Sequence, residues 1–260
     1  MKTLVERLRL DGQTVLVTGA SRGLGLQMAE GFGEMGAQVV LTARNEEDLA
    51  QARAQLAERG IQARIVAGNV TDEAFLPELL RSAGSLNGRI DVLVNNAGAA
   101  WGGPAEDVPR KGWDKVMELN LNALFRLTQV VGREFMIPRR MGKVINIASI
   151  SGLRSIVPNP SRPSTVAYDT SKAAVIALTR SLATEWGRYG INVNAIAPGP
   201  FPSQMNTLAG DWEAQLKAAI PLGRFGGAED LKGAAVFLAS EAASFVHGHT
   251  LVVDGGRTCC

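Results

Sequence analysis

The chain has 260 residues, of which 46% are hydrophobic and 20% charged, and this length and composition fit one globular domain over residues 1–260 with a large buried core. The formal net charge of +2 gives no ground for binding nucleic acid or an anionic membrane, and no apolar run approaches the ~18 residues that span a bilayer. The start of the chain does not fit a signal peptide, and the cysteines, Cys259 and Cys260, form neither a disulfide framework nor a zinc motif. We therefore expect a cytoplasmic protein without a metal site.

The first predicted strand leads directly into a glycine-rich turn. Residues 14–18 are a short apolar, β-rich run, and a helical pattern of apolar residues extends from the turn to Met35. In this context Gly19 permits a tight turn, Gly23 lets the backbone approach a pyrophosphate, and Gly25 lets helix and strand pack closely. The helix N-terminus adds amide groups and a positive dipole. The pattern predicts a dinucleotide site, and the alternative is an ordinary strand–helix turn.

Further strand–helix units follow along the chain. Strands are predicted at residues 38–42, 63–67, 91–95, 142–148, 190–197 and 250–253, and helices at 46–59, 72–85, 113–135 and 228–240. This alternation predicts an α/β fold: a Rossmann-like, doubly wound parallel sheet of about seven strands with helices on both faces. The ligand crevice of such a sheet lies at the carboxyl ends of its strands. Gly19, Ala43, Asn69 and Asn95 lie at or just beyond such ends.

Tyr168 and Lys172 begin a long apolar helical run. Residues four apart lie one turn apart on the same helix face, so the phenol and the ammonium should project side by side. A neighbouring positive charge favours the phenolate and lowers the pKa of Tyr168, which would make a proton donor and acceptor near neutral pH. Taken alone, this spacing is also found between ordinary exposed residues of a helix, and that is the alternative interpretation.

Other polar residues carry weaker signals. The proline-rich loop at residues 153–165 contains Arg154 and Arg162, and long loops are often functional, so we weigh substrate contact against a solvated insertion or a subunit contact. Arg139 and its neighbour are interpreted as a solvated loop. His247 and the histidine two residues later lack the carboxylate or cysteine partners of a metal site, so we expect a structural role.

The motifs together resemble the short-chain dehydrogenase/reductase family. They are Thr18-Gly-x3-Gly-x-Gly25, Asn95-Asn-Ala-Gly98, Asn120, Ser149, Tyr168-x3-Lys172 and Pro198-Gly199, in the order of the family and across nearly the whole chain. The nearest groups are the 3-oxoacyl reductases and the small sugar-acid or alcohol dehydrogenases. The loop that contains Arg154 is longer than is usual for the family.

The resemblance implies an oxidoreductase that transfers hydride between a nicotinamide and a carbonyl or secondary alcohol. Tyr168 would be the general acid/base, Lys172 would also hold the nicotinamide ribose, Ser149 would bind the substrate oxygen, and Asn120 would hold a relay water. The expected cofactor-binding residues are Gly19, Ser21, Arg22, Gly23, Leu24, Gly25, Arg44, Asn69, Val70, Asn96, Ala97, Gly98, Tyr168, Lys172, Pro198 and Gly199.

The residues after the second strand favour NADP(H) over NAD(H). An acidic residue there would bind the ribose 2′-hydroxyl and repel a 2′-phosphate, but this chain has Ala43 followed by Arg44. Arg22, within the glycine turn, can approach from the other side, and two guanidinium groups form a good phosphate site. Asn69 replaces the Asp that is common in the family at the adenine pocket.

Substrate class and assembly remain open at this level. The family places a substrate lid at about residues 199–222, where Phe201, Met205, Leu208 and Trp212 slightly favour an oxoacyl-type or general ketone, whereas Arg154 and Arg162 fit an anionic sugar acid. A dinucleotide-binding sensor without turnover is the alternative to an enzyme, but it would not need Ser149, Tyr168 and Lys172 together. Residues 173–178 make the helix after Tyr168 apolar around its whole circumference. The sheet can cover only one side of it, so we expect a homo-oligomer, a tetramer by resemblance or a dimer.

Overall fold

The computed structural model describes residues 1–155, 164–202 and 211–259. Its strands form one seven-stranded parallel sheet in the order β3-β2-β1-β4-β5-β6-β7. The strands are β1 (Thr14–Thr18), β2 (Gln38–Ala43), β3 (Ala63–Ala67), β4 (Val92–Asn95), β5 (Gly142–Ile147), β6 (Ile191–Pro198) and β7 (Thr250–Val253). The predicted doubly wound α/β fold is confirmed.

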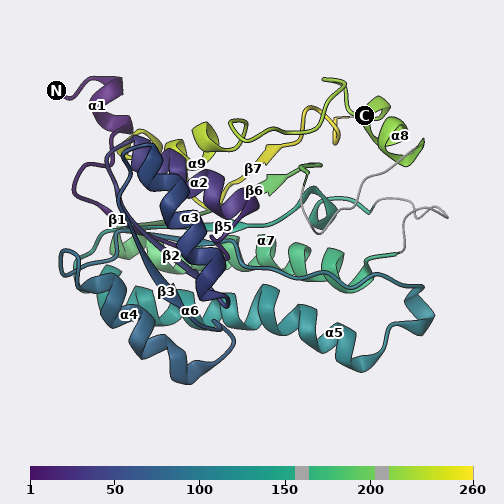
Figure 1. Ribbon diagram of the computed structural model, residues 1–260, viewed down its shortest axis with the longest axis horizontal. Helices are drawn as coiled ribbons and strands as arrows, with labels where there is room; N and C mark the ends of the chain where they lie inside the picture. The colour runs from purple at the N-terminus through teal and green to yellow at the C-terminus, as the bar shows by residue number, and fades with distance from the viewer. Residues whose placement is uncertain (156–163, 203–210, 260) are drawn as a thin grey trace.

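Helices cover both faces of the sheet (Figure 1). They are α1 (Leu4–Leu8), α2 (Gly23–Glu34), α3 (Glu46–Glu58), α4 (Leu76–Gly84), α5 (Arg110–Met117), α6 (Leu124–Val131), α7 (Val166–Trp186), α8 (Asp211–Ala218) and α9 (Lys232–Ala239). Helices α2, α3 and α9 lie on one face, and α4, α6 and α7 lie on the other. Short 3₁₀ turns lie at Glu73–Phe75, Ala105–Asp107, Ile150–Gly152, Gly187–Tyr189 and Glu241–Ala243.

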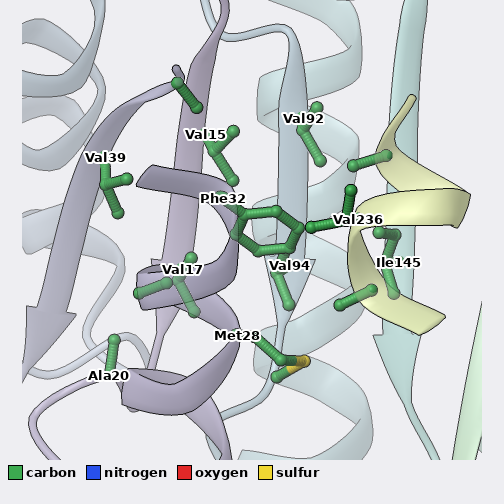
Figure 2. Close-up of a cluster of buried hydrophobic side chains, with 14 of the residues drawn as sticks. Val15, Val17, Ala20, Met28, Phe32, Val39, Val92, Val94, Ile145 and Val236 are labelled. Atoms are coloured by element: carbon green, nitrogen blue, oxygen red, sulfur yellow. The ribbon is translucent and has the colours of Figure 1, made fainter. Parts of the chain in front are cut away.

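The strands are apolar because both of their faces are covered. Val15 and Val17 of β1 pack under α2 and α9, while Leu16 between them packs against the opposite layer. Figure 2 shows the first of these layers, where the ring of Phe32 lies over β1 and β4 and faces Val236 of α9. All of β1 is buried, as expected for a strand between two helical layers.

The helix predicted over residues 113–135 differs in its hydrogen bonding. Two π-helical segments interrupt it, Glu118–Ala123 between α5 and α6 and Gly132–Met136 after α6. Asn120 lies in the first of them. Such segments often mark functional sites, and apolar periodicity alone does not distinguish them from an ordinary α-helix. The helix predicted at 228–240 is shorter and begins at Lys232.

The interpretation of Arg139 and Arg140 as a solvated loop fits Arg140, which is exposed, but it misses the ion pair of Arg139. Its Nη2 donates a 2.7 Å hydrogen bond to Oδ1 of Asp91, whose side chain is almost fully buried. Asp91 also accepts from the backbone N–H of Thr14 at 2.9 Å and from Nε of Arg89 at 3.1 Å. A buried carboxylate needs such partners, and the arginine supplies one at the amino edge of the sheet.

His247 has the structural role that we expected. Its Nδ1 accepts a hydrogen bond from the N–H of Val193 at 3.2 Å, and its Nε2 lies 2.7 Å from the carbonyl oxygen of Ala183. Within the described ranges, no three His, Cys, Asp or Glu side chains are grouped as they would be around a metal ion. In those same ranges, no helix has the length and apolar character to cross a membrane.

Candidate active site

The glycine-rich turn after β1 is joined to the end of β4. The Oγ1 of Thr18 accepts hydrogen bonds from the N–H groups of Asn96 and Ala97, both at 3.0 Å. The Asn96 side chain donates to the carbonyl oxygens of Thr18 and Gly19, both at 2.9 Å. Gly19 has φ +62°, and an added Cβ would lie 2.8 Å from Cα of Ala97. Only glycine therefore fits at position 19. The hydrogen bonds hold the turn after β1 and the loop after β4 against each other.

The N-terminus of α2 presents its first amide groups without a side-chain cap. The residue before the helix, Arg22, makes no capping hydrogen bond, whereas Asn45 caps α3 by accepting from the N–H of Asp48. Uncapped amide groups at a helix N-terminus attract phosphate. Gly25, in the first turn of α2, is buried against the Asn96 amide, and an added Cβ would come within 2.5 Å of it. The turn thus fits a pyrophosphate group.

Two arginines, one from the turn after β2 and one from the glycine turn after β1, lie near the end of β2. Arg44 is exposed, and Arg22 reaches from the glycine turn to Asp48 in the first turn of α3, with Nη1 and Oδ2 3.4 Å apart. This ion pair is largely exposed and therefore weak, so Arg22 can turn toward a stronger anion. The structure brings both arginines to the N-terminal end of α3.

The end of β3 offers fewer side-chain contacts than we expected. Asn69 is exposed, and its Oδ1 accepts a 3.2 Å hydrogen bond from the N–H of Thr71. Val70 is buried and packs in the core between α4 and the sheet. The Val70 side chain therefore serves in core packing, and a cofactor could contact only the backbone of Val70. Ser21 and Leu24 are half-buried in the glycine turn and at the start of α2.

Lys172 lies one turn after Tyr168 on α7 and is almost completely buried. Its Nζ donates a 2.6 Å hydrogen bond to the carbonyl oxygen of Ile147 at the end of β5 and lies 5.6 Å from the centroid of the Tyr168 ring. An added Cβ on Gly98 would come within 3.7 Å of this Nζ, so the loop after β4 also borders the amine. Burial lowers the pKa of Lys172 to about 8 because desolvation disfavours the charged form.

Ser149 lies two residues after the end of β5 and is the N-cap residue of the 3₁₀ turn Ile150–Gly152. Its Oγ accepts a 3.1 Å hydrogen bond from the N–H of Ser151, and both serines are nearly buried. An added Cβ on Gly152 would lie 2.6 Å from the carbonyl carbon of Lys172. The glycine of this Ser-x-x-Gly sequence therefore lets the Ser149 turn rest directly on α7 beside the buried amine.

Asn120 is completely buried and joins three elements. Its Oδ1 accepts from the N–H of Ala99 at 2.8 Å, and its Nδ2 donates to the carbonyl oxygen of Ala99 and to Oγ of Ser171, both at 2.9 Å. Ala99 belongs to the loop after β4, and Ser171 belongs to α7. The Asn120 side chain thus connects the loop after β4 with α7, and both of its donor hydrogens are used.

The end of β6 lies beside the chain that follows β7. Pro198 pairs with Val253, and the N–H of Gly199 donates to the carbonyl oxygen of Val253 at 2.9 Å. Phe201 is buried against Gly226 in the core beneath α2 and α9, so it does not line the apolar lid that we expected. Met205, Leu208, Arg162 and the side chain of Trp212 lie outside the described residues.

The structure gathers most of the expected site residues at one edge of the sheet. Thr18 and Ser171 were missed by the sequence analysis. Thr18 opens the glycine motif, where its hydroxyl could have been recognised as a partner for a neighbouring loop. Ser171 directly precedes Lys172, but its partner Asn120 is distant in the sequence, so no local pattern reveals it.

Comparisons with known proteins agree with this geometry. The sequence model of a family described as enoyl-(acyl carrier protein) reductase matches residues 19–258. Gluconate 5-dehydrogenase of Gluconobacter oxydans (strain 621H) is 43% identical over 252 residues, which cover 96% of each chain. NAD-dependent glycerol dehydrogenase of Listeria innocua serovar 6a is 39% identical over 253 residues, covering 96% of this chain and 95% of that protein.

A solved structure extends the likeness to three dimensions. The gluconate 5-dehydrogenase of Burkholderia cenocepacia J2315, in complex with NADP and tartrate, has a TM-score of 0.90 and 37% sequence identity, and covers 99% of this chain and 100% of its own. The relatives are dehydrogenases, so the enzyme interpretation is confirmed over a dinucleotide-binding sensor. The chain belongs to the short-chain dehydrogenase/reductase family and is an oxidoreductase that acts on alcohol or carbonyl groups.

Proposed function

We propose that the protein is an NADP(H)-dependent oxidoreductase that interconverts a secondary alcohol and a ketone on a sugar acid, a polyhydroxy carboxylic acid. The observation that carries this proposal is the buried Lys172 beside Tyr168, with the Ser149 turn resting on the same helix. In reduction Tyr168 donates a proton to the carbonyl oxygen, and in oxidation it removes the hydroxyl proton. NADP(H), when bound, supplies or accepts the hydride.

Ser149 and Lys172 prepare this proton transfer. The Oγ of Ser149 accepts from the N–H of Ser151, so its hydroxyl hydrogen can be donated to the substrate oxygen. The Lys172 ammonium favours the phenolate form of Tyr168 and would also hold the nicotinamide ribose. Both Nδ2 hydrogens of Asn120 are used, so a relay water at this residue would be held by one of its acceptors.

The cofactor proposal rests on the rim of β2. Ala43 places no carboxylate near a 2′-phosphate, while Arg44 is exposed and Arg22 extends to the same rim. Two guanidinium groups bind a phosphate well. One relative in the comparison has NAD in its name, and the solved relative holds NADP; the arginines favour the second for this chain.

The cofactor preference can be reversed by two substitutions. Ala43→Asp with Arg44→Leu adds a carboxylate that binds a 2′-hydroxyl and removes a phosphate partner. The double variant should prefer NADH, while the wild type should show the higher kcat/KM with NADPH. Steady-state kinetics with both cofactors measure this. A wild type with a higher kcat/KM for NADH would contradict the proposal.

Two observations favour a sugar acid over an acyl thioester. Phe201 is a core residue, so it no longer supports an apolar substrate; of the four apolar lid residues named from the sequence, it alone has a side chain that the structure describes. Arg154 is exposed and ends the turn that begins at Ser149, where its charge suits a carboxylate. The gluconate 5-dehydrogenase relatives support the same substrate class.

A substrate panel tests the function directly. The loss of NADPH absorbance should be fastest with a keto-gluconate, slower with neutral keto-sugars, and slowest with an acetoacetyl thioester. The reverse reaction with gluconate and NADP⁺ should reduce the cofactor. Turnover confined to the thioester would overturn the substrate class, and no turnover with any ketone would overturn the proposed reaction.

We also propose that the working form is a homotetramer, or a homodimer. Ala173 and Ala177 of α7 are exposed, and Phe125 on α6 is partly exposed. Small apolar residues on an uncovered helix face fit a helix of a second subunit.

The residues around 199–222, which include α8, form the proposed substrate lid. The cytoplasm is the proposed location.

A further inference from the structure

Ser171 is a completely buried serine on α7 that lies between the acid/base residue and Asn120. Its hydroxyl donates a 2.7 Å hydrogen bond to the backbone carbonyl oxygen of Tyr168 and accepts a 2.9 Å hydrogen bond from Nδ2 of Asn120. One hydroxyl therefore links the turn that carries the phenol to the π-helical segment on the neighbouring helix.

We propose that Ser171 is a positioning residue, which fixes Tyr168 relative to the nicotinamide side of the site; this inference rests on the proposed function. The connection runs from the backbone of Ala99, through the Asn120 side chain, to Ser171 and Tyr168. Ala99 directly follows Gly98, which borders Lys172 Nζ. These hydrogen bonds thus fix the position of the Tyr168 phenol relative to the loop after β4, which would contact the bound cofactor.

The position requires a hydroxyl group. Only a group that accepts from Asn120 and donates to a carbonyl oxygen at the same time completes both bonds. Alanine would do neither, and it would leave one buried Nδ2 hydrogen of Asn120 without an acceptor, which is a costly state in a dry interior. The Asn120 amide would then turn or shift, and the first turn of α7 would lose its hydrogen bond to the neighbouring π-helical segment.

Thr179, two turns further along α7, separates this role from ordinary stabilisation. It is also completely buried, donates to the carbonyl oxygen of Val175 at 2.8 Å and accepts from Nδ2 of Asn146 at 3.0 Å. Its bonds have the same chemistry as those of Ser171, but they join α7 to Asn146 near the carboxyl end of β5 and include neither Tyr168 nor Asn120. It provides the matched control.

The experiment compares Ser171→Ala with Thr179→Ala. With the best ketone of the panel, Ser171→Ala should lower kcat about ten- to a hundredfold, because displacement of a catalytic group by ~1 Å costs up to about a hundredfold. Its KM for NADPH should stay within about twofold, since Ser171 touches no proposed cofactor atom. Thr179→Ala should lower the melting temperature but keep kcat near that of the wild type.

Hydrogen exchange gives a readout that needs no turnover. Ser171→Ala should speed amide exchange in peptides covering residues 97–101 and 164–172, and Thr179→Ala should leave these peptides unchanged. Wild-type kcat in Ser171→Ala, or an equal loss of kcat in Thr179→Ala, would overturn the positioning role. If the wild type turns over no ketone, the proposed function fails, and unchanged exchange in Ser171→Ala then overturns the positioning role separately.

Discussion

Lys172 has a buried amine whose hydrogen-bond partner is a neutral carbonyl group. A carboxylate in place of Ile147 O would neutralise the ammonium, whereas a carbonyl oxygen orients it and leaves its charge to act on its surroundings. The Tyr168 ring lies 5.6 Å away. In a nearly dry environment this charge acts strongly on a phenol. Under the proposed function, burial of Lys172 therefore strengthens the action of its charge on the phenol, even though it lowers the pKa of the amine to about 8.

Removal of the phenol hydroxyl tests the acid/base assignment. Tyr168→Phe barely changes side-chain volume but removes the only group proposed to exchange the substrate proton. It should lower kcat by at least the ~10²–10⁴-fold expected for general acid–base catalysis. NADPH affinity should change little, because the phenol is not proposed as a main contact of the cofactor. Steady-state kinetics and NADPH fluorescence titration measure the two effects. Near wild-type turnover in a folded variant would mean that another group supplies the proton.

The pH dependence of alcohol oxidation tests Lys172. Below pH 8 the amine is mostly protonated, and its charge favours the phenolate that oxidation requires. Lys172→Met has no charge at any pH, so its phenolate should form only at higher pH and its apparent pKa for oxidation should rise. Loss of the ribose contact should also weaken NADPH binding.

Lys143 supplies a matched control for this pH profile. Its pKa is also lowered to about 8, mainly by burial, but it lies at the amino end of β5 and bonds Oδ1 of Asn192 at 2.8 Å. Lys143→Met should therefore leave the pH profile of oxidation unchanged. A profile that moves equally in both variants would assign the effect to general electrostatics and not to the Tyr168–Lys172 pair.

At the scale of single elements, the strands could be predicted because their signal is local. The apolar run of β1 and the glycine turn after it lie within a dozen residues of each other. Features that depend on distant partners could not be predicted. The π-helical segment Glu118–Ala123 coincides with a bond between Asn120 and Ala99, and Arg139 is held by Asp91, which lies 48 residues away in the sequence. Periodicity describes one helix face, and it does not identify these partners.

Helices α2 and α9 are joined by a buried charge. Lys232, at the start of α9, forms ion pairs with Glu30, Glu34 and Glu229, and its side chain is only 7% exposed. Burial alone would lower the pKa of Lys232, but the hydrogen bonds to the three carboxylates outweigh it and raise the pKa. An added Cβ on Gly31 would lie 3.0 Å from the lysine stem, so the two helices pack closely.

Lys232→Met should destabilise the fold by about 1–3 kcal/mol, because it leaves the mostly buried carboxylate of Glu30 without this partner. The loss is moderate since Arg59 Nη1 still lies 2.5 Å from the Glu30 carboxylate. Urea unfolding measures the change. Lys217→Met removes an exposed pair with Glu213 on α8 and should cost at most about 0.5 kcal/mol. Equal losses in both variants would contradict the argument.

At the scale of the whole molecule, the candidate site lies where the order in which strands are added to the sheet reverses. The chain builds β1, β2 and β3 outward on one side and then returns to add β4 through β7 on the other. The bonds from Asn96 and Ala97 to Thr18 lie at this reversal between β1 and β4. Open α/β sheets bind ligands at such a point. The sequence predicts a ligand crevice at the carboxyl ends of the strands, but it does not predict the strand order that brings β4 beside β1.

Assembly is the property of the whole molecule that most needs a measurement. The face of α7 that carries Ala173 and Ala177 is exposed in the single chain, and a second subunit with the same face would cover it. Light scattering at micromolar concentration should give a mass near four, or two, times the 27.5 kDa of the chain. A single peak at the mass of the chain would contradict the proposal.

One substitution on this face and one elsewhere locate the interface. Ala177→Arg places a long charged side chain where the subunits would meet, and burying an unpaired charge is strongly unfavourable, so the assembly should dissociate to a smaller species. Ala54→Arg introduces the same side chain at an exposed position on α3, far from the proposed contact, and should keep the wild-type mass. If Ala177→Arg keeps the full mass while remaining folded, the subunits meet through another surface, and the exposed alanines of α7 have no part in the assembly.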